Sequence, residues 1–115
     1  MATERRIEKL NILLREEISR IMDRELEFPE NTLVTCTRVA TSVDRKYAIA
    51  YFTVLGREKG AMEILQKNRY NIQKLLIKKV RIRPVPAINF ALDEEEMRRE
   101  GVEKSISELK RKGEI

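Results

Sequence analysis

Two runs rich in β-branched and aromatic residues, 33–41 and 46–55, are separated by only four residues, Ser42 to Arg45. Neither run contains Gly or Pro, as is typical of strand interiors. The short link contains Ser and Asp, which favour tight turns, and a link of this length joins neighbouring antiparallel strands. The pattern therefore predicts a β-hairpin, and every other element of the chain has to pack around it.

Helical spacing of apolar residues flanks the hairpin on both sides. In residues 4–25 apolar side chains recur every three or four positions, which predicts one helix. This helix has to end before Pro29, because proline cannot continue it. A second stripe covers 58–78 and is interrupted near 68–70, so we expect a helix with a bend at that point.

The remaining residues predict one more strand and one more helix. Residues 87–92 alternate in hydrophobicity and are expected to form the third strand. Asp93 is placed to cap a helix over 94–112. The order is then α-β-β-α-(bend)-α-β-α. A helical crossover makes the second and third strands parallel, so we expect an α+β fold with a three-stranded mixed sheet and helices packed on one face. This is the layout of a type II KH domain.

The positive charge of the chain is concentrated in one stretch. The whole chain carries a net charge of +5. Residues 57–83 hold nine basic and two acidic side chains, a charge of +7, whereas residues 1–56 are balanced and residues 84–115 carry −2. An unbalanced basic stretch attracts a polyanion, so a nucleic acid is the expected partner.

Basic and aromatic side chains in and near this stretch are the candidate RNA contacts. The lysines and arginines are expected to bind phosphates, and the tyrosine to stack on a base. Two members come from the hairpin, and the others lie on an exposed helix face, at the bend, or in the extended segment after the helix. The set is Arg45, Lys46, Lys67, Arg69, Tyr70, Lys74, Lys78, Arg81 and Arg83.

Residue types that support catalysis are scarce. The chain has no histidine, which removes the usual general base near neutral pH and the commonest metal ligand. The one cysteine, Cys36, has no histidine to activate it and is expected to be a small apolar residue of a strand. In the acidic run 93–96, successive side chains of a helix point in different directions and do not converge on one ion. We expect no enzymatic activity, no metal, no cofactor and no small-molecule substrate.

The length of the chain and its N-terminal residues indicate the number of domains and the cellular location. A chain of 115 residues fits a single domain, which we expect to cover residues 1–115. It begins with charged residues and lacks a long apolar run, so we expect no signal peptide, no membrane span and a cytoplasmic location.

Three stretches resemble ribosome-binding factor A, a bacterial small-subunit assembly factor. They are Val39 to Asp44 running into Tyr47 to Phe52, Ile72 to Leu76, and Arg81 to Pro86 followed by Ile88 to Phe90. Two departures are Asn68-Arg69-Tyr70, where the family often has Ala-x-Gly at the bend, and Arg45, where it usually has an apolar residue. The resemblance implies a type II KH-like fold, a cytoplasmic location, and non-catalytic binding to the free 30S subunit and 16S rRNA. It also implies a role in maturation of the 16S rRNA 5′ end. We expect the protein to be a monomer.

Two other functions stay open on the sequence alone. A general KH-type RNA-binding protein would need a GxxG loop to clamp the RNA backbone, and this chain has none. A protein-interaction module would use the outer face of the sheet, where Tyr47, Ile49 and Tyr51 are expected to point.

Overall fold

The helices and strands follow one another in the predicted order. The computed structural model describes residues 2–99. The elements are α1 (Ala2–Glu25), β1 (Leu33–Thr41), β2 (Tyr47–Leu55), α2 (Glu58–Lys67), α3 (Arg69–Lys79) and β3 (Ala87–Leu92). The chain is helical again at 94–99, which confirms the start of the last predicted helix; the remainder, to residue 112, lies outside the described residues.

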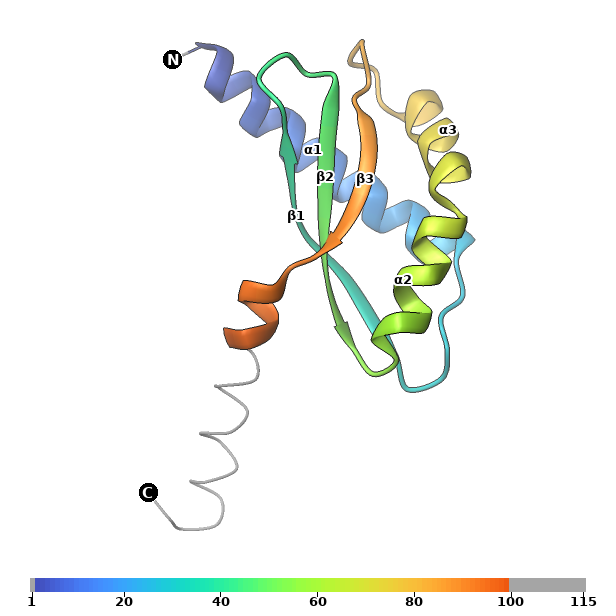
Figure 1. The fold of residues 1–115 in the computed structure, drawn as a ribbon. Helices are drawn as coiled ribbons and strands as arrows, with labels where there is room; N and C mark the ends of the chain where they lie inside the picture. Colours follow the sequence, from blue (N-terminus) through green and yellow to red (C-terminus); the bar gives the residue numbers. More distant parts are fainter. Residues whose placement is uncertain (1, 100–115) are drawn as a thin grey trace.

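The three strands form one mixed sheet, in the order β1-β2-β3. β1 and β2 pair antiparallel as the predicted hairpin, whereas β2 and β3 pair parallel. Figure 1 shows α1 crossing behind the sheet, with α2 and α3 stacked end to end on the β3 side. The predicted α+β, type II KH-like arrangement is therefore confirmed, with α1, α2 and α3 on one face.

The core lies between the sheet and this layer of helices. On the inner face of β2 the residues Ala48, Ala50 and Phe52 are at most 2% exposed. The two alanines let the helix stripes approach the sheet closely, because they add almost no side-chain volume. The Phe52 ring fills the centre and meets Phe90 of β3 edge-on, with ring centroids 5.5 Å apart. The predicted stripe of the first helix supplies the other wall, with Leu10, Leu14, Ile18 and Ile21 buried.

A β-bulge in β1 decides which residues face outward. Cys36 pairs with Phe52, but the next pair in the ladder is Arg38 with Tyr51, so Thr37 is an extra residue. Simple alternation would put Cys36 and Arg38 on the same face. The bulge instead turns Arg38 outward, where its guanidinium carbon lies 3.7 Å from the centroid of the Tyr51 ring.

The predicted bend between the two crossover helices falls at Asn68. Its backbone N–H is shared between the carbonyls of Ile64 (3.1 Å) and Leu65 (3.2 Å). Its side-chain amide also donates to the Ile64 carbonyl, at 2.8 Å. The asparagine side chain therefore adds a second donor to the Ile64 carbonyl. Asn68 has φ −98°, so the bend does not require a glycine.

A glycine brings the two loops at one end of the sheet into contact. Gly56 follows β2 with φ +114°, a conformation that residues with a side chain rarely adopt. A Cβ atom here would overlap the carbonyl oxygen of Asn31 and lie 2.9 Å from Cα of Thr32. The Arg57 N–H donates to the Thr32 hydroxyl at 3.3 Å, so the two loops are also hydrogen-bonded.

Asp93 ties the last described helix to the bulge. One carboxylate oxygen accepts the N–H of Glu96 at 3.2 Å, which confirms the predicted helix cap. The other oxygen accepts the Thr37 hydroxyl at 2.6 Å and lies 3.4 Å from Nε of Arg38. The Thr37 hydrogen bond, aided by the Glu96 N–H and the Arg38 charge, outweighs burial and lowers the pKa of Asp93.

This lowered pKa predicts a loss of stability in acid. A carboxyl whose pKa is lower in the folded state contributes stability above its unfolded pKa, near 4, and loses it as the pH falls through the folded pKa. We expect Asp93→Asn to cost roughly 1–2 kcal/mol at pH 7. Between pH 7 and pH 3 its free energy of unfolding should then fall less than that of the wild type, as measured by urea denaturation. Asp23→Asn, at an exposed site of α1, is the control. Equal losses in wild type and Asp93→Asn would contradict the assignment.

Candidate nucleic-acid interface

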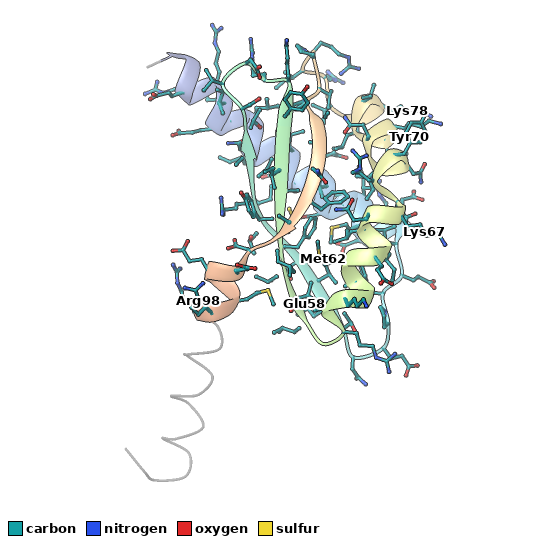
Figure 2. All side chains as sticks on the ribbon, viewed as in Figure 1. Glu58, Met62, Lys67, Tyr70, Lys78 and Arg98 are labelled. Atoms are coloured by element: carbon teal, nitrogen blue, oxygen red, sulfur yellow. The ribbon has the colours of Figure 1, made fainter. Side chains whose placement is uncertain are left out.

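Three basic residues form an exposed ridge along α2 and α3. We define the basic ridge as Lys67, Lys74 and Lys78, all of which are exposed. In Figure 2 the side chains of Lys67, Tyr70 and Lys78 project from the same side of these helices, away from the sheet. The inward side of the same helices carries the buried Ala61, Leu65, Ile72 and Leu76. Apolar spacing on one side therefore places the cations on the other.

The cations of the basic ridge lack the carboxylate partners that α1 provides for its own. On α1, Arg20 lies 2.7 Å from Glu17 and 3.9 Å from Glu16. Within residues 2–99, no salt bridge involves a residue of the ridge. The first turn of α3 also contains no acidic residue. The ridge is therefore positively charged, and its counterions are mobile ions of the solvent.

Tyr70 stands beside the ridge as an open aromatic surface. It is 77% exposed, the most accessible aromatic side chain in the described part of the chain. The ammonium group of Lys74 lies 5.5 Å from its ring centroid, one helical turn away. This cation–π contact limits how far the Tyr70 and Lys74 side chains can move apart. A planar group that stacks on Tyr70 would also come close to a positive charge.

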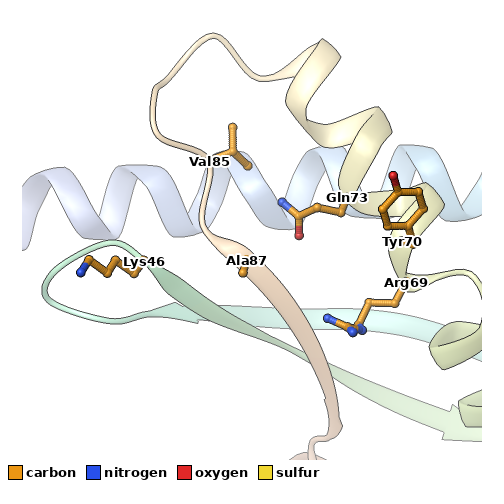
Figure 3. A pocket seen from close by; sticks show the side chains of 6 residues that line it. All are labelled: Lys46, Arg69, Tyr70, Gln73, Val85 and Ala87. Carbon is orange, nitrogen blue, oxygen red and sulfur yellow. The ribbon is translucent and has the colours of Figure 1, made fainter.

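A groove of about 340 Å³ lies next to Tyr70, between α3 and the start of β3 (Figure 3). Its lining residues are Lys46, Arg69, Tyr70, Gln73, Val85 and Ala87. In Figure 3, Arg69 and Gln73 point from α3 toward β3, whereas Lys46 extends from the hairpin with its ammonium group directed away from Arg69. The structure thus brings three predicted residues, Lys46, Arg69 and Tyr70, to one groove.

Gln73 sets the width of this groove, and sequence reasoning missed its role. Its amide nitrogen donates to the Pro86 carbonyl at 2.9 Å, and its amide oxygen accepts the Ile88 N–H at 2.8 Å. These two bonds join α3 to the backbone at the start of β3. Because glutamine carries no charge, neither the charge distribution nor the apolar spacing singled it out. Val85 and Ala87 were missed for the same reason.

Arg83 differs from the other predicted contacts, because its guanidinium is bound to its own backbone. It donates to the carbonyls of Ile77 at 2.7 Å and Ile82 at 3.1 Å, and also to that of Val80. These carbonyls lie at and just beyond the end of α3, where helix carbonyls lack partners within the helix. Arg83 therefore stabilises the end of α3, whereas its neighbour Arg81 is exposed and has no such bonds among the described residues.

The two hairpin residues of the predicted set sit on an ordered turn. The Ser42 hydroxyl donates to the Asp44 carboxylate at 2.7 Å, which also accepts the Lys46 N–H at 3.0 Å. These bonds, the Ser42 one foremost, lower the pKa of Asp44. Arg45 has φ +61° and is half-buried, whereas Lys46 is exposed. The turn presents Lys46 to solvent, close to the groove.

The described residues provide neither a reactive thiol nor a cluster of metal ligands. Burial raises the pKa of the Cys36 thiol to about 12 against an opposing effect of Arg15, so the thiol is not a nucleophile near neutral pH. Within residues 2–99, no three His, Cys, Asp or Glu side chains gather as a metal site requires. In the same part of the chain, no helix is both long and apolar enough to cross a membrane.

Sequence comparisons match most of this chain to one family. The family model described as ribosome-binding factor A matches residues 6–106. A protein of that name from Macrococcus caseolyticus is 34% identical over 109 residues, covering 92% of this chain and 96% of its own. One from Dictyoglomus thermophilum is 36% identical over 108 residues, covering 90% of each chain.

Solved structures agree with the sequence comparisons. The crystal structure of ribosome-binding factor A from Thermus thermophilus matches with a TM-score of 0.65 and 25% identity, over 73% of this chain and 91% of that one. A homology model of the Thermus thermophilus protein, fitted into a cryo-EM map of a 30S–RbfA complex, matches with a TM-score of 0.66 and 25% identity, over 74% of this chain and 92% of that one.

Proposed function

Because this chain belongs to the ribosome-binding factor A family, we propose that it binds the free 30S ribosomal subunit in the cytoplasm and assists its assembly. In this proposal it acts as a monomer, contacts 16S rRNA and helps the 5′ end of that RNA to mature, without forming or breaking a covalent bond. The 30S complex of the Thermus thermophilus relative supports the choice of subunit.

The basic ridge is the observation that carries the proposal. Its cations have no carboxylate partners among the described residues, so the protein gives up no salt bridge when they meet phosphates. Binding then releases the counterions of the RNA, which favours association at low salt. The charged residues of α1 have no such advantage, because several of them are already paired.

The contacts are expected to follow the RNA backbone and shape rather than its sequence. Lysine and arginine bind phosphates whatever the base, and the Gln73 amide, which could read a base edge, is occupied by backbone groups. Lys46 and Arg69 would hold phosphates at the two sides of the groove, with further contacts from Arg45 and Arg81. Tyr70 would add stacking on an unpaired base, worth on the order of 1–3 kcal/mol. Arg83 would contribute by holding the end of α3.

Co-sedimentation over a series of salt concentrations tests the proposal. Purified protein is mixed with free 30S subunits or with assembled 70S ribosomes and then pelleted. We expect it to pellet with free 30S subunits and only weakly with 70S ribosomes. The logarithm of its affinity for 30S subunits should fall linearly with the logarithm of the salt concentration. Equal recovery with both particles, or an affinity that does not depend on salt, would contradict the proposal.

A further inference from the structure

The outer face of the sheet, turned away from α1, α2 and α3, carries a second surface. Near the hairpin it holds a shallow groove of about 300 Å³, lined by Ala40, Thr41, Ser42, Tyr47, Ala48 and Ile49. Tyr47 is 64% exposed and Ile49 39% exposed. Large apolar side chains that share one exposed groove mark an interaction site more often than single exposed ones do.

The Thr41 and Ser42 hydroxyls, which line this groove, are already hydrogen-bonded within the chain. The Thr41 hydroxyl donates to the Asn11 side chain at 2.5 Å. The Ser42 hydroxyl donates to Asp44 at 2.7 Å and accepts the Tyr47 N–H at 3.1 Å. The groove therefore offers apolar contact and little free hydrogen bonding, so its best occupant is an apolar side chain.

A fixed arginine lies one step along the same face. In the β1–β2 ladder, Arg38 pairs with Tyr51, and Ala40 pairs with Ile49 at the groove. Stacking on Tyr51 at 3.7 Å and the contact of Nε with Asp93 at 3.4 Å hold the Arg38 side chain, yet it stays 53% exposed. A cation that is held in place but still accessible loses little conformational entropy when it binds an anion.

We propose that this face binds a protein segment of the small subunit that places an apolar side chain in the groove and a carboxylate on Arg38. Arg38 and Ala40, which lines the groove, are two residues apart on β1 and point to the same face, so they lie roughly 7 Å apart. A strand with these groups at i and i+2, or a helix with them at i and i+4, has this spacing. The choice of the small subunit rests on the proposed function. The surface itself rests on the groove and on Arg38.

The charge of this face disfavours RNA and a second copy of this chain as occupants. Among the outward positions of the three strands only Arg38 is charged, whereas RNA binding depends on several phosphate contacts. A second copy of this chain, related by two-fold symmetry, would bring an identical sheet face, whose outward strand positions hold Arg38 and no carboxylate. Tyrosine, isoleucine and arginine together are instead typical of the centre of protein–protein interfaces.

Site-specific photo-crosslinking tests this inference. The crosslinking amino acid p-benzoylphenylalanine replaces Tyr47, which is exposed and of similar shape. The same residue at Ile12, 54% exposed on α1, serves as the control. Each protein is irradiated with purified free 30S subunits, and the adducts are mapped by mass spectrometry. We expect the Tyr47 position, and not Ile12, to label a protein segment in which an apolar residue lies two or four positions from an Asp or Glu. Added Arg38→Met or Ile49→Asp should reduce the adduct at least fivefold.

The outcomes separate this inference from the proposed function. Both added variants are at exposed positions, and unchanged melting temperatures would show that they fold. Pelleting with 30S subunits, but with crosslinks only to rRNA or within the chain, or with none above the control, would overturn this inference alone. An adduct that persists in both folded variants would overturn it as well. Failure to pellet at low salt would overturn the proposed function and this inference with it.

Discussion

Lys74→Glu combined with Lys78→Glu is expected to weaken binding to free 30S subunits about 100-fold or more. Hydrogen bonds to charged groups contribute roughly 1.5–3 kcal/mol each. When two such contacts are lost, the fold-changes in affinity multiply. The slope of log affinity against log salt should also fall by about 2, because roughly one counterion is released per phosphate contact. Equilibrium binding to purified subunits at several salt concentrations measures both quantities.

The matched control reverses two charges elsewhere with the same spacing. Arg5→Glu with Lys9→Glu changes the net charge equally, at exposed positions of α1 that are also four residues apart. We expect this control to weaken binding only slightly, through the overall charge. Both double variants should fold, since substitutions at exposed sites usually change stability by about 0.5 kcal/mol or less. If the two variants weaken binding equally, net charge and not the basic ridge governs the interaction.

Gly56→Ala is expected to give the largest loss of stability among substitutions that add only one methyl group. The positive φ alone costs a residue with a side chain roughly 1–3 kcal/mol. Overlap of the new Cβ with the Asn31 carbonyl adds to this, because backbone on both sides has to move. Urea denaturation should show a lower midpoint, and the loops at this end of the sheet should lose protection from amide hydrogen exchange.

Gly60→Ala provides a control that should raise the stability instead of lowering it. Gly60 lies in α2, and its new Cβ would meet only Pro29 at 3.7 Å and Arg57 at 4.0 Å, which are ordinary contacts. Alanine in a helix is more favourable than glycine by about 0.5–1 kcal/mol, so this variant should be more stable than the wild type. If Gly56→Ala lowered the stability no more than Gly60→Ala does, neither the positive φ of Gly56 nor its contact with Asn31 would determine the effect.

The sequence predicted the features that depend on periodicity. The third strand spans Ala87–Leu92 as expected, and the first strand Leu33–Thr41, because alternation and turn residues mark strand ends directly. The bend was placed correctly where the apolar stripe broke at Asn68. Exposure of the basic ridge followed from the same stripe, since a helix that buries one side must expose the other.

The features that the sequence did not predict depend on pairing between distant residues. The bulge at Thr37 appears only in the register of β1 against β2. Gln73 bridges to a strand 13 to 15 residues away, and no local pattern marks such a bond. Arg83 counted as one more cation of the basic stretch, because its bonds to the end of α3 depend on how the chain turns after the helix.

The bulge also determines where β1 can differ in length among related proteins. Removing Thr37 would leave Cys36 facing the core and Arg38 facing outward, as they do now, at the expense of the Asp93 hydrogen bond. A single deletion between Arg38 and the hairpin turn would instead shift the register and direct Arg38 into the core. A one-residue gap in an alignment of this hairpin therefore belongs at position 37, and a relative without the extra residue needs another partner for the carboxylate at position 93.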